Sequence, residues 1–505
     1  MKINISYFAI IIIALFSTSC EKYLDVNKDP NNPVEEYISV EQRLPAALYH
    51  TALQEVTQLN QLGSFWGGYW GTSTEGSNTY KKEQLYNGPA IMAKRDGIPI
   101  WENGYIYLNY YELLKVDSEG EVAPAYKAIA MVMQAWHYMR LVDTYGDIPF
   151  TQALQGQKYP RPAYDNGADV YKASIDMLST AAELLGRSPL PGEKRPAKDD
   201  ILFSGDLTKW IKFANTIKLR ALLRGSEVSS SSYIQAEISK MGLGASGIIT
   251  ASLFLTEMAQ VQPGFNATNL NPFWNTYYRN SSNKTTNGYI HIRPTQFAID
   301  NYSALSDPRL SKLYAKTKSG DYKGVIFGYE GSDAAYSKDN TSPLLGPAEN
   351  GGKAAAILKS QTQPIILLSA AESWFLLAEA AHRGWISGDA ADYYRNGISA
   401  SMQQMEIPPA ERDSYLSRPH VAYNNTLERI ILQKWMALNS ISGFEAWSDY
   451  RRVGLPEIPN TPGSSPDERP RRLLYPETEV QTNIAEVTKR GVTDITTARV
   501  WWDKD

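Results

Sequence analysis

The chain has 505 residues, with 50 Lys and Arg against 54 Asp and Glu, and its formal net charge is −4. Neither sign gathers in a long run, so the sequence offers no basic surface for nucleic acid, and we expect no nucleic-acid partner. A single cysteine excludes a disulfide framework, and the length suits one large domain or about two to three ordinary ones.

Residues 1–20 have the pattern of an export signal that ends at this only cysteine. Lys2 supplies the positive start, and residues 7–16 form an apolar run that is too short to cross a hydrocarbon core of about 30 Å. Small residues lead into Cys20, as in bacterial lipoprotein signals, although Ser17 stands where such signals usually have Leu. We expect cleavage after residue 19 and acylation of the Cys20 thiol, which would anchor the protein to membrane lipid. The alternative is an ordinary secretory signal with an idle cysteine.

Residues 20–45 are rich in Asp, Asn and Pro, and they are predicted to form an extended, lipidated tether. Helical periodicity dominates after it, with apolar residues at three- and four-residue spacing. The clearest helices are predicted at 124–144, 167–185, 207–225, 369–383 and 425–438. The stretch 378–402, with a turn at Gly388-Asp389, is typical of a tetratricopeptide-type hairpin, although no strict 34-residue repeat recurs.

Between residues 242 and 364 the composition shifts to Gly, Asn, Ser and Tyr, with few convincing helices. Long irregular segments inside compact proteins are usually functional, so this stretch is the predicted ligand-binding lobe. Two Pro-rich stretches, 186–198 and 454–476, lack long Gly/Ser runs, and we interpret them as ordered crossing loops.

The motifs that would indicate chemistry are weak. Gly242–Gly247 fits a dinucleotide-binding pattern, but a helix-like segment precedes it and a strand-like one follows, which reverses the order that the site needs. A calcium-loop pattern beginning at Asp25 has Pro30 where a positive φ is required. The five histidines have no ligand-like spacing. We therefore expect no enzyme, no metal and no cofactor. The alternative is a glycosidase, whose pair of carboxylates need not be close together in the sequence.

Aromatic residues give the strongest hint of a ligand. There are 32 Tyr and 12 Trp against 13 Phe, and rings with a polar edge suit the faces and hydroxyls of sugars. Two stretches concentrate them, 65–71, where rings alternate with Gly, and 271–280, where Asn and Arg accompany the rings. The predicted ligand-binding residues are Trp66, Tyr69, Trp70, Trp274, Asn275, Tyr277, Tyr278 and Arg279.

This prediction requires that at least one of Trp66 and Trp70 is exposed. The alternative is that these rings are internal anchors of their loops. Four other tryptophans lie on amphipathic helices and are predicted to support the fold instead: Trp136, Trp210, Trp374 and Trp435.

Several blocks occur together in one order along the chain. They are LDVNKDPNNP after the cysteine, WHYMRLVDTYGDIPF at 136–150, DLTKWIKFANTIKLRALLR at 206–224, SDPRL at 306–310, ESWFLLAEAA at 372–381, KWMALNSISGFEAWSDYRR at 434–452 and PRRLLYPETEVQTN at 470–483. Together they resemble the SusD/RagB-like outer-membrane lipoproteins of Bacteroidetes, in particular the SusD-like branch.

The resemblance implies a mainly α fold over 46–505. Degenerate tetratricopeptide-type hairpins at 46–240 and 365–455 would form a scaffold, and residues 242–364 would form the loop-rich lobe. The implied role is non-catalytic capture of oligosaccharides at the cell surface, on the outer membrane, and their delivery to a TonB-dependent transporter of the SusC type. Capture of peptides is the alternative, and a helical-repeat protein–protein adaptor is an alternative of another class.

Most matching blocks are implied to be scaffold. Lys434-Trp435, Phe444-Glu445 and Arg451-Arg452 have the pattern of helix packing and internal ion pairs. No binding residue follows from the resemblance itself, because the ligand face is where members of the family differ most.

Overall fold

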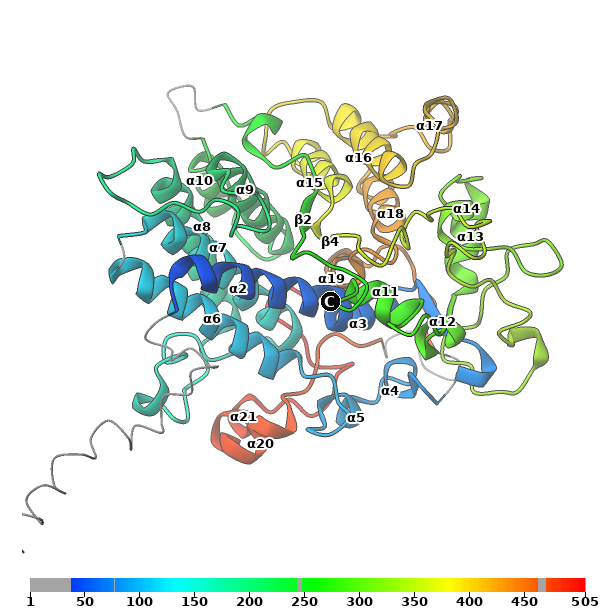
Figure 1. The fold of residues 1–505 in the computed structure, drawn as a ribbon, viewed down its shortest axis with the longest axis horizontal. Helices are drawn as coiled ribbons and strands as arrows, with labels where there is room; N and C mark the ends of the chain where they lie inside the picture. The colour runs from blue at the N-terminus through cyan, green and yellow to red at the C-terminus, as the bar shows by residue number, and fades with distance from the viewer. Residues whose placement is uncertain (1–37, 77, 121, 243–247, 462–468, 505) are drawn as a thin grey trace, which may run out of the picture.

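The computed structural model describes residues 38–76, 78–120, 122–242, 248–461 and 469–504. The signal, Cys20 and most of the tether predicted from the sequence therefore lie outside the described residues, as does most of the Gly242–Gly247 motif. Figure 1 shows helices α6 to α10 gathered on one side, α15, α16 and α18 beside them, and helices α11 to α14 on the opposite side. The fold is mainly helical, as predicted.

The five long helices predicted from periodicity are all present, within two residues at each end. They are α7 (Pro124–Tyr145), α8 (Gly167–Gly186), α9 (Leu207–Arg224), α15 (Ala370–His382) and α18 (Leu427–Leu438). Side chains cap several of their first turns. Asp206, for example, accepts hydrogen bonds from the backbone N–H groups of Thr208 and Lys209 at the start of α9. The buried face of α9 includes Trp210, Phe213 and Ile217.

Consecutive helices pack as antiparallel hairpins. α6 (Ile100–Gly120), α7, α8 and α9 pack in sequence order, and α15 packs on both α16 (Ala390–Gln404) and α18. The hairpin predicted at 378–402 is confirmed. Gly388 has a φ of +126°, and Asp389 caps the first turn of α16. Three further helices belong to the predicted scaffold or its C-terminal half: α10 (Ser231–Ser239), α17 (Pro409–Leu416) and α19 (Gly443–Val453).

The first described helix begins earlier than the sequence indicates. α2 (Val40–Gln54) starts five residues before the predicted end of the tether and continues through a π-helical turn (Glu55–Leu59) into α3 (Asn60–Trp66). Ser39 forms a capping box with Gln42, and Val40 and Leu44 are buried. Pro45, which suggested an extended chain, lies inside this helix because the apolar face gains more from burial than the lost backbone bond costs.

The lobe contains short elements joined by long connections. These are α11 (Pro272–Tyr277), α12 (Asn287–His291), α13 (Gln296–Ala304) and α14 (Leu310–Leu313). Two small antiparallel sheets join the lobe to the rest of the chain. β1 (Trp70–Thr72) pairs with β3 (Ile292–Pro294), and β2 (Ala259–Val261) pairs with β4 (Ile365–Leu368).

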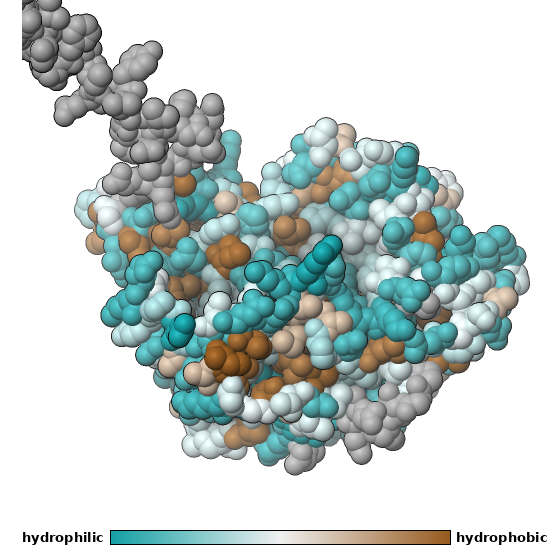
Figure 2. Space-filling model, turned by 90° about the horizontal axis from the view of Figure 1, so that it is seen from below, coloured by the Kyte–Doolittle hydropathy of each residue, from teal (hydrophilic) through white to brown (hydrophobic). Residues whose placement is uncertain are grey.

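The remaining helices lie at the edges of the fold. α4 (Lys81–Gln84) and α5 (Gly88–Met92) follow β1, and α20 (Glu477–Thr482) and α21 (Ile484–Arg490) lie near the C-terminus. On the face seen in Figure 2, hydrophobic side chains form separate clusters among hydrophilic ones. None of the helices in the described ranges is long and apolar enough to cross a membrane.

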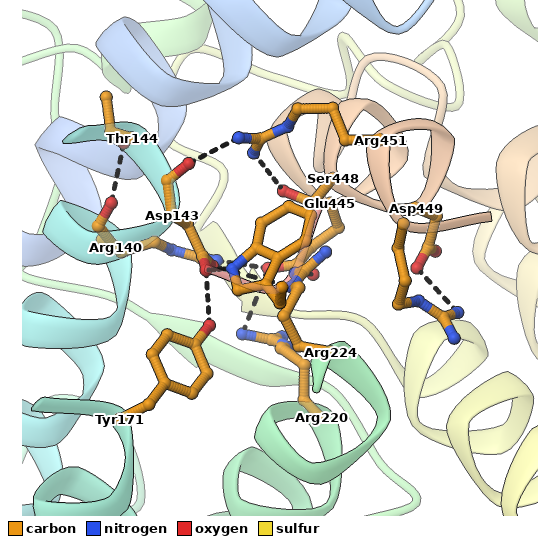
Figure 3. A network of polar contacts seen from close by, with 12 residues as sticks. Arg140, Asp143, Thr144, Tyr171, Arg220, Arg224, Glu445, Ser448, Asp449 and Arg451 are labelled. Atoms are coloured by element: carbon orange, nitrogen blue, oxygen red, sulfur yellow. Dashed lines mark hydrogen bonds and ion pairs between the residues drawn. The ribbon is translucent and has the colours of Figure 1, made fainter. Parts of the chain in front are cut away.

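Buried ion pairs connect the helices at the centre of the fold. Glu445 on α19 contacts Arg140 on α7, and Arg220 and Arg224 on α9 (Figure 3). Arg452 pairs with Glu379 of α15 at 2.6 Å, and Lys434 pairs with Asp449 at 2.8 Å. The internal ion pairs predicted for 434–452 are therefore confirmed, and they fix α19 against four other helices.

Candidate functional site

The aromatic rings predicted to bind ligand are buried. Trp66, Tyr69, Trp70 and Tyr277 have no exposed surface, Tyr278 is 2% exposed and Trp274 is 9% exposed. The prediction that Trp66 or Trp70 is exposed is wrong. Both rings are internal anchors, which was the alternative.

The polar edges of these rings are bonded inside the protein. Trp66 donates its indole N–H to the carbonyl of Glu83 at 2.8 Å, and Trp70 donates to Ser440 Oγ at 3.1 Å. Tyr69 donates its hydroxyl to the carbonyl of Trp435, and Tyr277 donates to Gln61 Oε1 at 3.0 Å. Burial raises the pKa values of Tyr69 and Tyr277 well above that of an exposed phenol, so both hydroxyls remain neutral donors.

The glycines of this stretch serve close packing instead of exposing the rings. A Cβ on Gly67 would lie 2.6 Å from the carbonyl oxygen of Gly63, and one on Gly71 would lie 2.7 Å from Val325 Cγ2. Gly68 has a φ of +82°, which a larger residue rarely adopts. The stretch connects the end of α3 to the start of β1, so its rings lie between a helix and a strand that both pack inward.

In the second aromatic stretch, two of the predicted residues reach the surface. Asn275 is exposed, and Arg279 is half-buried with Nη1 donating to the carbonyl of Asn283 at 3.0 Å. Trp274 and Tyr278 pack edge to face on each other, and the Tyr278 hydroxyl accepts a bond from the N–H of Ala348. Periodicity missed that 272–277 is a helix, although Asn271 and Pro272 are typical first residues of one.

Three of the four helical tryptophans are buried, as a role in the fold requires. Trp136, Trp210 and Trp435 are at most 2% exposed, whereas Trp374 is only half-buried.

A cavity of about 300 Å³ lies where the lobe meets the C-terminal crossing loop, and we call it the lobe pocket. Its wall on one side is the start of α13 with residues 325–327, and its wall on the other side is residues 458–460. Gly68, from the first aromatic stretch, lines it as well. The residues that form this pocket are Gly68, Thr295, Gln296, Phe297, Asp300, Val325, Ile326, Phe327, Ile458, Pro459, Asn460 and Arg469.

Backbone hydrogen bonds hold the wall on the α13 side. Thr295 caps α13 through its hydroxyl, which also donates to the carbonyl of Gly68 at 2.6 Å. The N–H of Thr295 donates to the carbonyl of Tyr69, and the N–H of Gln296 donates to the carbonyl of Val325. This wall is therefore preformed, which lowers the entropy lost on binding.

Buried side chains hold the floor of the lobe pocket. Arg469 is 1% exposed and donates to the carbonyls of Trp66, Ile458 and Pro459. Trp435 donates its indole N–H to the carbonyl of Gly67 at 2.7 Å and stacks on Tyr69 with ring centroids 4.8 Å apart. The predicted aromatic stretch therefore supports a pocket whose lining comes mainly from other parts of the chain.

The accessible surface of the lobe pocket is apolar with a polar rim. Phe297 is half-buried, Ile326 is 41% exposed, and Gln296 donates its amide to the exposed carboxylate of Asp300 at 2.8 Å. The guanidinium of Arg469 is engaged by backbone carbonyls. An apolar platform with a few hydrogen-bonding groups suits an uncharged ring that carries hydroxyls.

Comparison with known proteins identifies the family. A model of the SusD-like family, described as "starch-binding associating with outer membrane", matches residues 31–476. No protein of curated function matches the chain.

Solved structures share the fold over nearly their whole length. A SusD homologue from Bacteroides fragilis is 22% identical with a TM-score of 0.73, and one from Bacteroides uniformis is 24% identical with a TM-score of 0.69. A chitin-binding SusD homologue from Flavobacterium johnsoniae is 24% identical with a TM-score of 0.72. Each match covers 92% of this chain and 99% of the other. Because the family model spans most of the chain and the fold agrees with it, the protein belongs to the SusD-like family of outer-membrane-associated binding proteins.

Proposed function

We propose that this protein captures a neutral oligosaccharide in the lobe pocket without cleaving it. The observation that carries the proposal is the family match over residues 31–476. The lobe pocket adds a place for the ligand, since it is preformed, largely apolar and rimmed by Gln296 and Asp300. The chitin-binding relative with the same fold supports a glycan over a peptide.

The binding step follows from the residues at the surface of the pocket. The ring of Phe297 would stack on the CH face of one sugar unit, and Asp300 would accept a hydrogen bond from a hydroxyl. Asn275 on α11 and Arg279, two residues after its end, are proposed as a second polar contact for a longer chain, because their side chains reach the surface.

We also propose a lipid anchor and a transporter partner at the cell surface. Acylated Cys20 would hold the protein on the outer membrane, and the bound glycan would pass to a SusC-like TonB-dependent transporter. Co-purification of such a transporter with the membrane-anchored protein tests this partner, and its absence under conditions that preserve known complexes of this kind would contradict it.

Binding to a glycan array, followed by calorimetry, tests capture. Phe297→Ala should weaken binding of the selected glycan roughly tenfold or more, the usual effect of removing an interface anchor. Tyr159→Ala, which removes another half-buried ring from a different cavity, is the matched control and should leave affinity unchanged.

Three results would contradict the proposal. They are equal loss of affinity in both variants, hydrolysis of the bound glycan by the purified protein, and selection from a peptide library with no glycan bound. The last of these would favour peptide capture, and no small ligand at all would favour the adaptor.

A further inference from the structure

A second cavity, of about 350 Å³, lies between the end of α7 and the C-terminal segment. Three arginines line it, namely Arg472, Arg490 and Arg499, together with Asp147, Tyr475 and Trp501. We call it the arginine pocket. It shares no lining residue with the lobe pocket.

Arg472 differs from the other two arginines in its partners. Arg490 pairs with Asp147 at 2.9 Å, and Arg499 pairs with Asp503 at 2.8 Å. Arg472 is only 4% exposed, and no carboxylate among the described residues pairs with it. Its Nε donates to the carbonyl of Leu473 at 3.0 Å, and its guanidinium lies 5.0 Å from the centre of the Tyr475 ring. A buried guanidinium ordinarily has an anionic partner or several carbonyl acceptors, as Arg469 has, whereas the one hydrogen bond of Arg472 within the described residues goes to Leu473.

The unsatisfied polar atoms of this pocket are all donors. Arg472 Nη2, Arg490 Nε and Trp501 Nε1 are buried and lack an acceptor within the described structure. A group that only accepts hydrogen bonds would complement all three. A carboxylate offers two such oxygens and matches the fork of an arginine.

The backbone leaves room for this guanidinium. Gly146 has a φ of +78°, and a Cβ there would lie 2.9 Å from Arg472 Nη1. The pocket volume is near the lower end of the roughly 300–1,000 Å³ range of small-molecule sites, so it suits one small unit.

We propose that the arginine pocket binds the carboxylate of a small organic acid, with Arg472 as the charged partner and Trp501 Nε1 as a neutral donor. This inference does not depend on glycan capture in the lobe pocket, because the two cavities are lined by different residues.

The other explanation is that Arg472 only complements the negative end of α7, whose last turn lies beside it. That role needs no ligand, and it predicts the same stability with and without an added acid.

The test measures thermal unfolding and calorimetry of the full chain at constant ionic strength. Sodium glucuronate, a sugar acid, should raise the unfolding midpoint and bind, whereas glucose at the same concentration should not. A dipeptide with a free C-terminus and sodium acetate form two further arms, which distinguish a sugar acid from other sources of the carboxylate.

Two variants locate the effect. Arg472→Gln should weaken glucuronate binding tenfold or more, and Trp501→Phe, which keeps an aromatic ring but removes the indole N–H, should weaken it several-fold. The Trp501 variant keeps the test decisive if Arg472→Gln does not fold. Arg95→Gln, at an arginine whose side chain is 95% exposed, is the control and should bind normally.

Several results would overturn the proposal. They are the absence of binding by every carboxylate tested, an equal effect of glucose, unchanged binding in the Arg472 and Trp501 variants, and binding of inorganic phosphate while no carboxylate binds. Binding by acetate or the dipeptide in addition to glucuronate supports the carboxylate class, since all three carry the same group.

Discussion

Trp66, Trp70 and Trp435 each donate the indole N–H to an acceptor inside the protein, at 2.8, 3.1 and 2.7 Å. Their faces are covered as well. Trp66 packs edge to face on Trp447, and Trp70 does so on Phe65. A ring held at its edge and on its faces stabilises the fold and offers no platform to a ligand.

A variant that lacks such a ring should therefore be less stable than the wild-type protein. Trp66→Ala and Trp70→Ala should each lower the free energy of unfolding by about 3–5 kcal/mol, through the cavity and the unpaired acceptor. Urea unfolding followed by circular dichroism measures this. Tyr159→Ala is the control and should change stability far less, and an unchanged midpoint for either tryptophan variant would contradict an internal role.

At the scale of helices, the carboxylate of Glu445 connects α19 with α7 and α9. Glu445 on α19 is surrounded by Arg220, Arg224 and Arg140 (Figure 3). Burial alone would raise the pKa of Glu445, but these guanidinium groups hold the pKa well below its ordinary value of 4.5.

This lowered pKa makes part of the stability depend on pH. Because the folded protein binds the Glu445 proton more weakly than the unfolded chain does, the stabilisation is complete above about pH 4.5 and declines as the pH falls below that value. Glu445→Gln should lower stability at pH 7 by about 3–5 kcal/mol, since it leaves buried guanidinium groups without their carboxylate.

Unfolding midpoints of the wild-type chain and Glu445→Gln between pH 3 and 7 would measure both effects. The difference between the two proteins should shrink toward the acid end. Two parallel pH profiles would show that Glu445 is not the group responsible.

The hairpin of α15 and α16 depends on one close approach. A Cβ on Gly397 would lie 2.8 Å from the ring of Phe375, which is fully buried. Gly397→Ala should destabilise the protein by about 1–3 kcal/mol, because overpacking exceeds the gain in helix propensity.

Two variants accompany this one in thermal unfolding. Gly120→Ala at the end of α6, where nothing lies within 4 Å of the added carbon, should be neutral. Phe375→Leu combined with Gly397→Ala should recover part of the loss. If Gly397→Ala proves as stable as wild type, the two helices are not packed as closely as the structure has them.

At the scale of the whole molecule, the proposed lipid anchor is a prediction from the sequence. Cys20 lies outside the described residues, and the first described helix begins at Val40. Cys20→Ala should abolish acylation and release the protein from the membrane, with its circular dichroism spectrum and unfolding midpoint unchanged.

Membrane fractionation with lipid labelling measures this release. Cells that lack the partner transporter are needed, because binding to the transporter could retain the variant. Retention of Cys20→Ala in those cells would contradict a lipid anchor at this residue.

The sequence by itself determined the helices of the scaffold and the family. Helical periodicity and capping residues such as Asp206 act within a few positions along the chain, so α7, α8, α9, α15 and α18 could be located within two residues. The internal ion pairs of 434–452 could also be anticipated from the resemblance to the family, and they agree with the rule that a buried charged residue needs a partner.

Only the tertiary structure decided which rings are exposed and where the cavities lie. Trp66 and Trp70 look available in sequence because Gly surrounds them, but residues of 435–447, more than 300 positions away, cover them. The lobe pocket combines residues near 68, 295, 326 and 458, and the arginine pocket combines residues near 146, 472 and 501. No local sequence pattern predicts these contacts. The burial of a side chain and its hydrogen-bond partners depend on how distant segments pack, and not on its neighbours along the chain.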